Sequence, residues 1–212
     1  MFYLTKMPWI VKKFIYPRYI WSLPVVGKNI YLTFDDGPHP TVTPFVLDLL
    51  KEYHAKATFF CIGKNVLDNA GVYRRILNEG HSVGNHTHNH LDGWKVDDGK
   101  YLHNIITASK HIDSTLFRPP YGRITKFQSK QVMEELGFNI IMWSVLTGDF
   151  DINLSPEDCW KNTLKAIVPG SVIVFHDSEK AKDRMMYVLP KLLKHFIDEG
   201  FSFERITLQK RE

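Results

Sequence analysis

Short apolar runs alternate with amphipathic stretches along most of this chain, and this alternation restricts its fold more than any other feature. The apolar runs have strand-like length and composition, at 30–34, 57–61, 82–85, 115–118, 138–144, 171–176 and 202–206. The stretches between them have helical periodicity, at 44–53, 70–79, 101–113, 126–136, 156–167 and 184–199. Such alternation predicts an α/β fold with a parallel sheet and right-handed crossovers.

Residues typical of helix ends support the predicted helix boundaries. Thr43 and Ser155 each precede a proline at a predicted first turn, where a hydroxyl can act as the N-cap. Glycines suited to a left-handed C-cap follow three of the helices, at positions 80, 137 and 200.

Two of the runs are apolar on both faces, which indicates a sheet that is buried on both sides. These runs are Ile140–Trp143 and Val172–Phe175. Seven strands with their helices in a chain of this length favour a small, distorted (β/α)7 barrel, although periodicity alone also allows a doubly wound open sheet. We expect one domain over residues 29–212, with residues 1–28 as a lead-in that packs on the barrel through aromatics such as Trp9 and Trp21.

Charge and cysteine content exclude some classes of partner. The net charge is only +4, from 27 basic and 23 acidic residues, and no Lys/Arg block marks a nucleic-acid site. Cys61 and Cys159 make no disulfide framework, and Cys61 lies in an apolar run. No apolar stretch at the N-terminus suits a signal core or a membrane span. We therefore expect a cytoplasmic monomer, or a secreted or envelope protein if a leader has been removed.

Conspicuous polar residues fall at the carboxyl ends of the predicted strands. They are Asp35 and Asp36 after the first strand, His86 and His90 after the third, Arg118 at the end of the fourth, Asp149 after the fifth and His176 at the end of the sixth. In a parallel sheet these ends share one edge, where active sites are built. We therefore expect these side chains to converge.

The segment 84–90 holds three histidines, of which His86 and His90 are four residues apart. On a helical turn this spacing would point both imidazoles the same way. With a carboxylate such as Asp36 they would form a two-histidine, one-carboxylate metal site that leaves positions open for water and substrate. The alternative is a histidine-rich polar loop with no ligand.

The remaining polar groups suit acid–base chemistry. One carboxylate of the pair would be free to act as a base, and His176 could act as an acid. A positive charge from Arg118 would keep the base ionised, while Asp149 would keep His176 protonated at neutral pH. The alternative for His176 and Asp149 is a capping or core hydrogen bond.

Five segments carry a resemblance to a known family: Thr33–Gly37, His86–His90, Arg118–Gly122, Trp143–Phe150 and Val174–His176. In this order and spacing, the chain from Lys28 to about Ile206 resembles the NodB-homology polysaccharide deacetylases, carbohydrate esterase family 4. The resemblance implies a distorted (β/α)7 barrel. It also implies metal-dependent removal of N- or O-acetyl groups from sugars.

The resemblance also assigns roles to residues. Asp35 would be the base, oriented by Arg118, while Asp36, His86 and His90 would bind a divalent metal. That metal is commonly zinc, with cobalt, nickel or manganese as alternatives. His176, supported by Asp149, would be the acid. The substrate would contact the backbone N–H of Tyr121 and the pocket-lining Phe150 and Val174. Apart from the resemblance, we also expect Pro119 and Trp94 to contact the substrate.

Three positions depart from the family pattern. Leu146 stands where many members have Asp, Phe150 where they have Trp, and Val174 where Leu is usual. None of these changes removes a predicted ligand, base or acid. They reshape the acetyl pocket, so the identity of the sugar polymer stays open.

Peptidoglycan, chitin oligomers and acetylated hemicellulose are all compatible substrates, and an N-acetylglucosamine glycan is the expectation from family habit. Trp94 and Tyr121 could stack on its sugar rings, although Trp94 could equally anchor a loop. Two other classes remain as alternatives: a non-haem iron oxygenase, which shares the ligand set, and a carbohydrate-binding relative without turnover.

Overall fold

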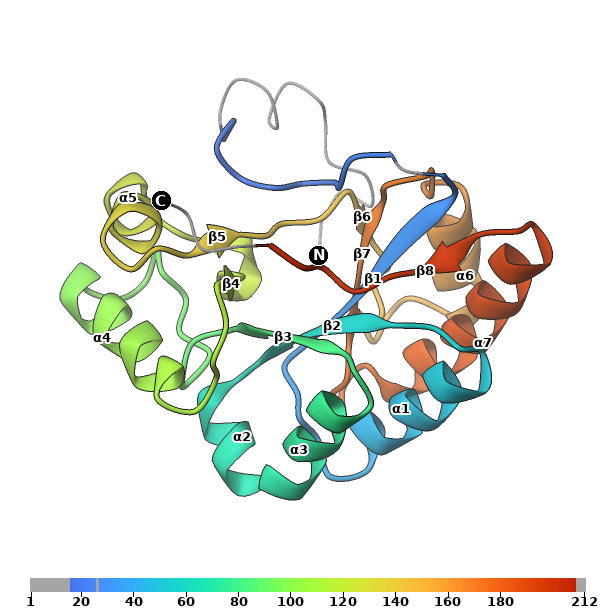
Figure 1. The fold of residues 1–212 in the computed structure, drawn as a ribbon, viewed down its shortest axis with the longest axis horizontal. Helices are drawn as coiled ribbons and strands as arrows, with labels where there is room; N and C mark the ends of the chain where they lie inside the picture. Colours follow the sequence, from blue (N-terminus) through green and yellow to red (C-terminus); the bar gives the residue numbers. More distant parts are fainter. Residues whose placement is uncertain (1–15, 26, 209–212) are drawn as a thin grey trace.

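A single curled β-sheet of parallel strands organises the molecule (Figure 1). The structure is a computed structural model, and it describes residues 16–25 and 27–208. The strands are β1 (Asn29–Asp35), β2 (Ala57–Cys61), β3 (Ser82–Asn85), β4 (Leu116–Phe117), β5 (Asn139–Ile140), β6 (Val145–Leu146), β7 (Val172–His176) and β8 (Ser202–Phe203). Their order is β5-β4-β3-β2-β1-β7-β6, and β8 pairs with β1.

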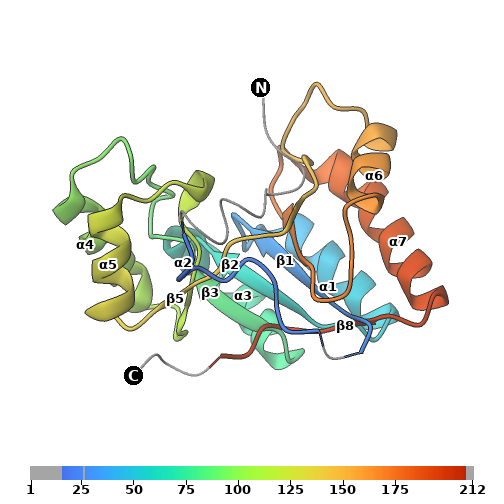
Figure 2. The same ribbon diagram turned by 90° about the horizontal axis from the view of Figure 1, so that it is seen from above.

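Helices cover the outer face of this sheet. They are α1 (Val42–Glu52), α2 (Gly63–Asp68), α3 (Ala70–Asn78), α4 (Asp98–Ser109), α5 (Lys126–Glu134), α6 (Pro156–Leu164) and α7 (Lys182–Asp198). Figure 2 shows α4 and α5 at one side of the sheet and α6 and α7 at the other. The predicted α/β class and distorted barrel are confirmed. The barrel is distorted because β5 and β6 are the two ends of the strand order and do not pair with each other. The sheet is therefore a curled half-barrel.

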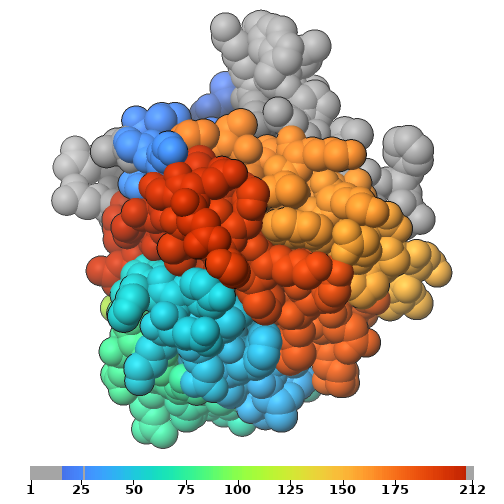
Figure 3. All heavy atoms as spheres, turned by 90° about the vertical axis from the view of Figure 1, so that its right-hand side faces the viewer, coloured from blue at the N-terminus to red at the C-terminus, as the bar shows by residue number. Residues whose placement is uncertain are grey.

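The two faces of β1 are both buried but have different neighbours. Ile30, Leu32 and Phe34 belong to the main apolar cluster, which also contains residues of α1 and α7. The space-filling view in Figure 3 shows the orange-red segment of α7 directly beside the light-blue segment of α1. Because side chains alternate along a strand, Thr33 and Asp35 point to the inner face of the curl. The inner face is therefore where β1 can present polar groups.

Residues 16–25 lie against the open side of the sheet. Tyr19 and Trp21 are buried, and they pack with residues of α4 and α5. The Ile20 N–H donates to Ile140 O at 2.9 Å, and the Met142 N–H donates to Ile20 O at 2.7 Å. The rest of the predicted lead-in, residues 1–15 with Trp9 and residue 26, lies outside the described residues.

Several predicted boundaries need correction. The apolar run 138–144 is not one strand, because only β5 lies within it and pairs with β4. The next strand, β6, begins after the run at Val145 and pairs with β7, so the chain between β5 and β6 crosses from one partner to the other. Thr43 is not the N-cap of α1. That position is Thr41, and the Thr43 hydroxyl instead donates a short hydrogen bond to Asp177. The short helix α2 was not predicted.

Other local predictions are confirmed. The Ser155 hydroxyl caps α6 by accepting the Asp158 N–H, and Pro156 is the first helical residue. Gly80, Gly137 and Gly200 all have positive φ after their helices. Cys61 and Cys159 are buried free thiols. Across residues 16–25 and 27–208, no helix combines the length and apolarity needed to cross a membrane.

Candidate active site

The inner face of the sheet brings Asp35 and His176 side by side. They are register partners on the parallel strands β1 and β7, and adjacent strands lie about 4.8 Å apart. The Asp35 residue is 4% exposed, while His176 is half-buried at the strand end. A carboxylate and an imidazole therefore face one space at the carboxyl edge of the sheet, as the sequence predicted.

Arg118 lies under this pair and is fully buried. Its Nη1 donates to Asp35 Oδ1 and to Thr33 Oγ1, both at 2.7 Å. Its Nε donates to Ile141 O at 3.0 Å, and its Nη2 donates to Met142 O at 2.8 Å. The guanidinium also lies 4.1 Å from the centre of the Phe60 ring. Four of the five guanidinium N–H groups thus have acceptors, which fixes the orientation of the Asp35 carboxylate.

Asp36, His86 and His90 form a second cluster next to Asp35. Their possible ligand atoms all lie within 4.8 Å of one another. Asp36 Oδ1 lies 3.1 Å from His90 Nε2 and 3.7 Å from His86 Nε2. Burial alone would raise the pKa of Asp36, but the neighbouring imidazoles of His90, His176 and His86 outweigh burial and lower it. The carboxylate is therefore ionised.

This cluster fits a divalent metal ion. Asp36 Oδ1 is buried and has no hydrogen-bond partner in the structure, although two imidazole nitrogens lie close to it. Zinc with ligand bonds of 2.0–2.2 Å in a tetrahedron would place ligand atoms about 3.3 Å apart, close to the observed separations. His86 Nδ1 contacts Arg118 O at 2.8 Å. Since a carbonyl can only accept, Nδ1 carries the hydrogen and Nε2 presents its lone pair to the cluster.

The convergence of His86 and His90 does not arise from a helical turn, so that part of the prediction is wrong. The segment after β3 is a loop in which Thr87 and His90 adopt φ of 63° and 54°. Asp36 and Tyr121 also have positive φ, at 77° and 60°. Left-handed backbone is costly for residues with a side chain, and such strain gathers at functional sites.

Asp149 holds His176 from the side opposite Asp35. The fully buried carboxylate accepts from His176 Nδ1 at 2.8 Å and from the His176 backbone N–H at 2.7 Å. Burial would lower the pKa of His176, but the charge and hydrogen bond of Asp149, and then the charges of Asp36 and Asp35, raise it to about 10. The expectation that Asp149 keeps His176 protonated at neutral pH agrees with this geometry.

The residues predicted to contact the substrate differ in how closely they approach the side chains of this centre. The Phe150 ring is edge-on to His176, with centroids 5.3 Å apart, and the Tyr121 ring is 4.6 Å from the ring of His90. Val174 is buried two residues before His176, on the same face of β7. Pro119 is buried and leads into the turn at Tyr121. Trp94 is 60% exposed on a neighbouring loop.

Several residues that hold the site were missed from the sequence. Asn65 on α2 donates to Asp36 O at 2.7 Å, and Asn104 on α4 accepts the backbone N–H groups of His88 and Asn89. Asp177 is fully buried against Gly37, where any side chain would collide with its carboxylate. Such contacts connect elements far apart in the chain, so the only sequence signal was the presence of polar residues near predicted element ends.

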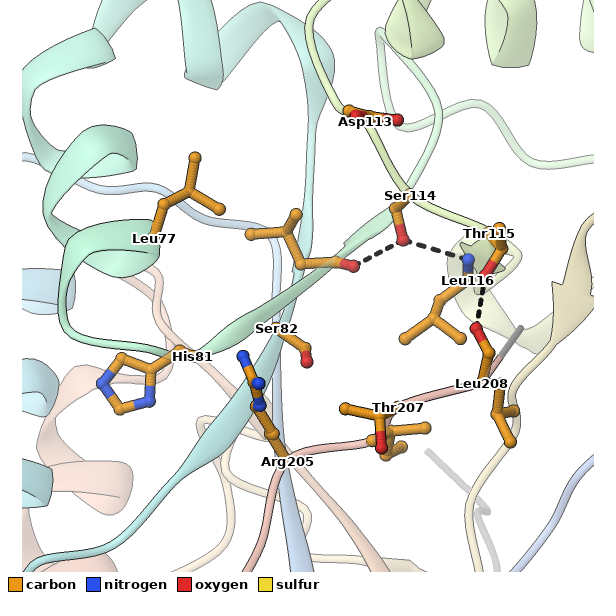
Figure 4. A pocket seen from close by; sticks show the side chains of 12 residues that line it. Leu77, His81, Ser82, Asp113, Ser114, Thr115, Leu116, Arg205, Thr207 and Leu208 are labelled. Atoms are coloured by element: carbon orange, nitrogen blue, oxygen red, sulfur yellow. Dashed lines mark hydrogen bonds between the residues drawn. The ribbon is translucent and has the colours of Figure 1, made fainter. Parts of the chain in front are cut away.

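A hollow of about 590 Å³ lies at the other edge of the sheet and is not part of this site. Its lining includes Ser82 and Leu116, which begin β3 and β4, together with Arg205 after β8 (Figure 4). The Ser114 and Thr115 hydroxyls beside it are engaged with backbone carbonyls. The site residues, by contrast, follow the carboxyl ends of the same strands.

Comparison with known proteins shows the family of this chain. The family model described as polysaccharide deacetylase matches residues 23–141, more than half of the chain, and the chain belongs to this family. It is 35% identical over 193 residues to a peptidoglycan-N-acetylglucosamine deacetylase of Bacillus cereus, covering 88% of this chain and 90% of that one. It is also 35% identical to a chitooligosaccharide deacetylase of a Bradyrhizobium strain, over 71% of each chain.

A solved structure shares the fold at full length. The crystal structure of a peptidoglycan N-acetylglucosamine deacetylase superposes with a TM-score of 0.80 and 33% identity, covering 97% of this chain and 100% of that one. The chain is therefore a hydrolase of the polysaccharide deacetylase family, in the group called carbohydrate esterase family 4.

Proposed function

We propose that the protein removes N-acetyl groups from N-acetylglucosamine units of a glycan by direct hydrolysis. The observation that carries the proposal is the pairing of Asp35 with His176 across β1 and β7, directly beside the cluster of Asp36, His86 and His90. Base, acid and ligand set therefore share one edge of the sheet, and all come from one chain. We propose the monomer as the functional unit for that reason.

Asp36, His86 and His90 would hold the metal, with zinc as the proposed ion because two imidazoles and a carboxylate match its preferences. A bound divalent ion would lower the pKa of water and polarise the acetyl carbonyl. Asp35, held by the hydrogen bond from Arg118, takes a proton from the attacking water. The Tyr121 backbone N–H stabilises the negative charge on the carbonyl oxygen.

His176 completes the reaction by giving its proton to the sugar nitrogen, so that the amine leaves and acetate is released. Phe150 and Val174 enclose the acetyl methyl group beside it. Because water is the proposed nucleophile, the reaction requires no serine or cysteine nucleophile; Cys61 and Cys159 are both buried. The parallel α/β sheet also argues against the oxygenase alternative, whose ligand set sits in antiparallel barrels.

The substrate class rests on the relatives, whose names refer to peptidoglycan N-acetylglucosamine and to chitooligosaccharides. Both contain N-acetylglucosamine, so we propose that sugar over acetylated xylan. The test measures acetate release from N-acetylglucosamine oligomers, from peptidoglycan and from acetylated xylan, with and without a chelator. Unchanged release by the Asp35→Asn variant, or by protein stripped of metal, would overturn the mechanism.

A further inference from the structure

The hollow at the amino edge of the sheet differs from the active site in the charges that line it. It lies between the starts of β3 and β4 and the segment that follows β8, and its volume of about 590 Å³ is typical of pockets that hold small molecules. Figure 4 shows Asp113 and Arg205 at opposite ends of this space, with Ser82 and Leu116 between them. We call it the amino-edge hollow.

The two ends of the amino-edge hollow carry opposite charges. Among the lining residues, Arg205 has the one guanidinium and Asp113 the one carboxylate. Both are exposed, and in the part of the chain that the structure describes neither has an ion pair or a side-chain hydrogen bond. Burial, the charge of Lys56 and that of Arg205 lower the pKa of His81 to about 4, so this lining imidazole is neutral. The hollow therefore presents one unpaired charge of each sign.

Apolar side chains lie on both sides of the hollow. Leu77 on α3 is 44% exposed and Leu208 is half-buried, and Figure 4 shows them facing the space from opposite sides. Beneath them, Leu116 and Ile206 are 3% and 1% exposed and belong to one buried apolar cluster. A ligand in the hollow would therefore cover apolar surface between the two charged ends.

Hydrogen bonds within the protein fix the walls of the hollow. The Ser114 hydroxyl donates to a backbone carbonyl of β3 at 2.6 Å, and the Thr115 hydroxyl donates to Leu208 O at 2.9 Å. The Ile206 N–H donates to the Thr58 hydroxyl at 2.8 Å, which ties the segment after β8 to β2. The walls keep their positions without a ligand, and such preorganisation lowers the entropy cost of binding.

We propose that the amino-edge hollow binds a short zwitterionic peptide. The terminal carboxylate of the peptide pairs with the Arg205 guanidinium, whose planar donors match a carboxylate. Its terminal ammonium group pairs with Asp113, and apolar side chains between the two ends cover Leu77 and Leu208. A ligand of a single charge sign would use only one of the two charged ends. The site is separate from the proposed reaction and needs no metal.

The test measures binding by NMR titration of isotope-labelled protein with two probes, the dipeptide leucyl-leucine and the tripeptide leucyl-alanyl-leucine. The tighter probe is then compared with its C-terminal amide, which lacks the carboxylate, and with its desamino analogue, which lacks the ammonium group. Each derivative should bind the wild type about two- to five-fold more weakly than the free peptide, the size expected for loss of one exposed ion pair.

Two variants assign each charge to its partner. Arg205→Gln should weaken the free peptide about two- to five-fold and leave binding of the amide unchanged, because the amide has no carboxylate to lose. Asp113→Asn should weaken the free peptide similarly and leave the desamino analogue unchanged. Lys161→Gln on α6 and Asp198→Asn on α7 remove exposed charges elsewhere and should bind all probes as the wild type does.

The titration also locates the peptide. The backbone amide signals of Ser82 and Leu116 should shift, while those of His86 and His90 stay in place. Absence of shifts at Ser82 and Leu116 with either peptide, or shifts at the two histidines alone, would overturn the site. Equal binding of the free peptide and both derivatives would overturn the zwitterionic ligand. None of these outcomes depends on acetate release, so failure of the proposed function would leave them unchanged.

Discussion

Arg118 is the residue on which the reactive carboxylate depends. A buried guanidinium needs hydrogen-bond acceptors, and here Asp35, Thr33 and two backbone carbonyls accept from four of its five N–H groups. Arg118→Met would leave the Asp35 charge buried without a partner. We expect the free energy of unfolding to fall by about 3–5 kcal/mol at neutral pH, measured by urea denaturation.

Thr33→Val is the matched control, because it removes one neutral partner and keeps the ion pair. The expected loss is smaller, about 1–3 kcal/mol. Equal losses of unfolding free energy for the two variants would show that the ion pair stabilises the fold no more than the neutral hydrogen bond does.

His176 gives a pH prediction with a definite sign. The proposed acid must carry a proton, and Asp149 helps raise the pKa of His176 to about 10. The rate should therefore hold through neutral pH and fall as the pH rises towards that value. Asp149→Asn removes the charge, so the falling limb of kcat should move to lower pH by about one unit or more. A pH–rate profile whose alkaline limb does not move would contradict the assignment of His176.

At the level of elements, the sequence predicted the presence of most strands and helices. It did not predict where neighbouring strands begin, end and pair. Strands such as 57–61 and 172–176 were predictable because they are apolar on both faces. The early end of β5 within the run 138–144 could not be predicted from its pattern, and neither could β6 after it, since both depend on which neighbouring strand is there to pair. The site residues were predictable because parallel strands end at one edge.

The supports of the site were not predictable. Asn65 lies on a six-residue helix that has no strong periodicity, and its partner is a backbone carbonyl 29 residues away. The left-handed backbone of Thr87 and His90 likewise has no signal in residue type. Tertiary contacts determine both features.

The contact from α2 yields a prediction of its own. The Asn65 amide holds the backbone of Asp36, so Asn65→Ala should let that carboxylate turn away from the histidines. Loss of such an outer contact typically weakens metal affinity 10–100-fold. Zinc affinity can be measured by competition with a chromophoric chelator. Asn78→Ala, on the exposed end of α3, should leave the affinity unchanged; equal affinities for the wild type and Asn65→Ala would contradict the role of α2.

At the scale of the whole molecule, the main core and the candidate metal site lie in different places. The main cluster of buried residues lies between the sheet and its helices, whereas the ligands follow the strand ends. A chelator should therefore abolish acetate release while the far-ultraviolet circular dichroism stays native. Adding zinc should raise the melting temperature in proportion to the logarithm of its concentration, because only the folded state holds the site. Loss of the native spectrum on chelation would show instead that the metal is structural.

The segment 16–25 connects the open side of the half-barrel to the reactive centre. Its Ile20 hydrogen-bonds on either side of Ile141, and the carbonyls of Ile141 and Met142 accept from Arg118, which holds Asp35. Trp21 is 6% exposed beside this contact, so Trp21→Ala should cost about 3–5 kcal/mol of unfolding free energy. We also expect kcat to fall with little change in KM, because the orientation of the base is disturbed rather than the binding of the glycan.

Stability is measured by urea denaturation, and the kinetics by acetate release from an N-acetylglucosamine hexamer. Leu77→Ala, on the exposed side of α3, removes apolar surface without touching this connection and should change neither. If Trp21→Ala lost stability but kept the wild-type kcat, the segment would support the fold alone, and the orientation of Asp35 would depend only on the sheet.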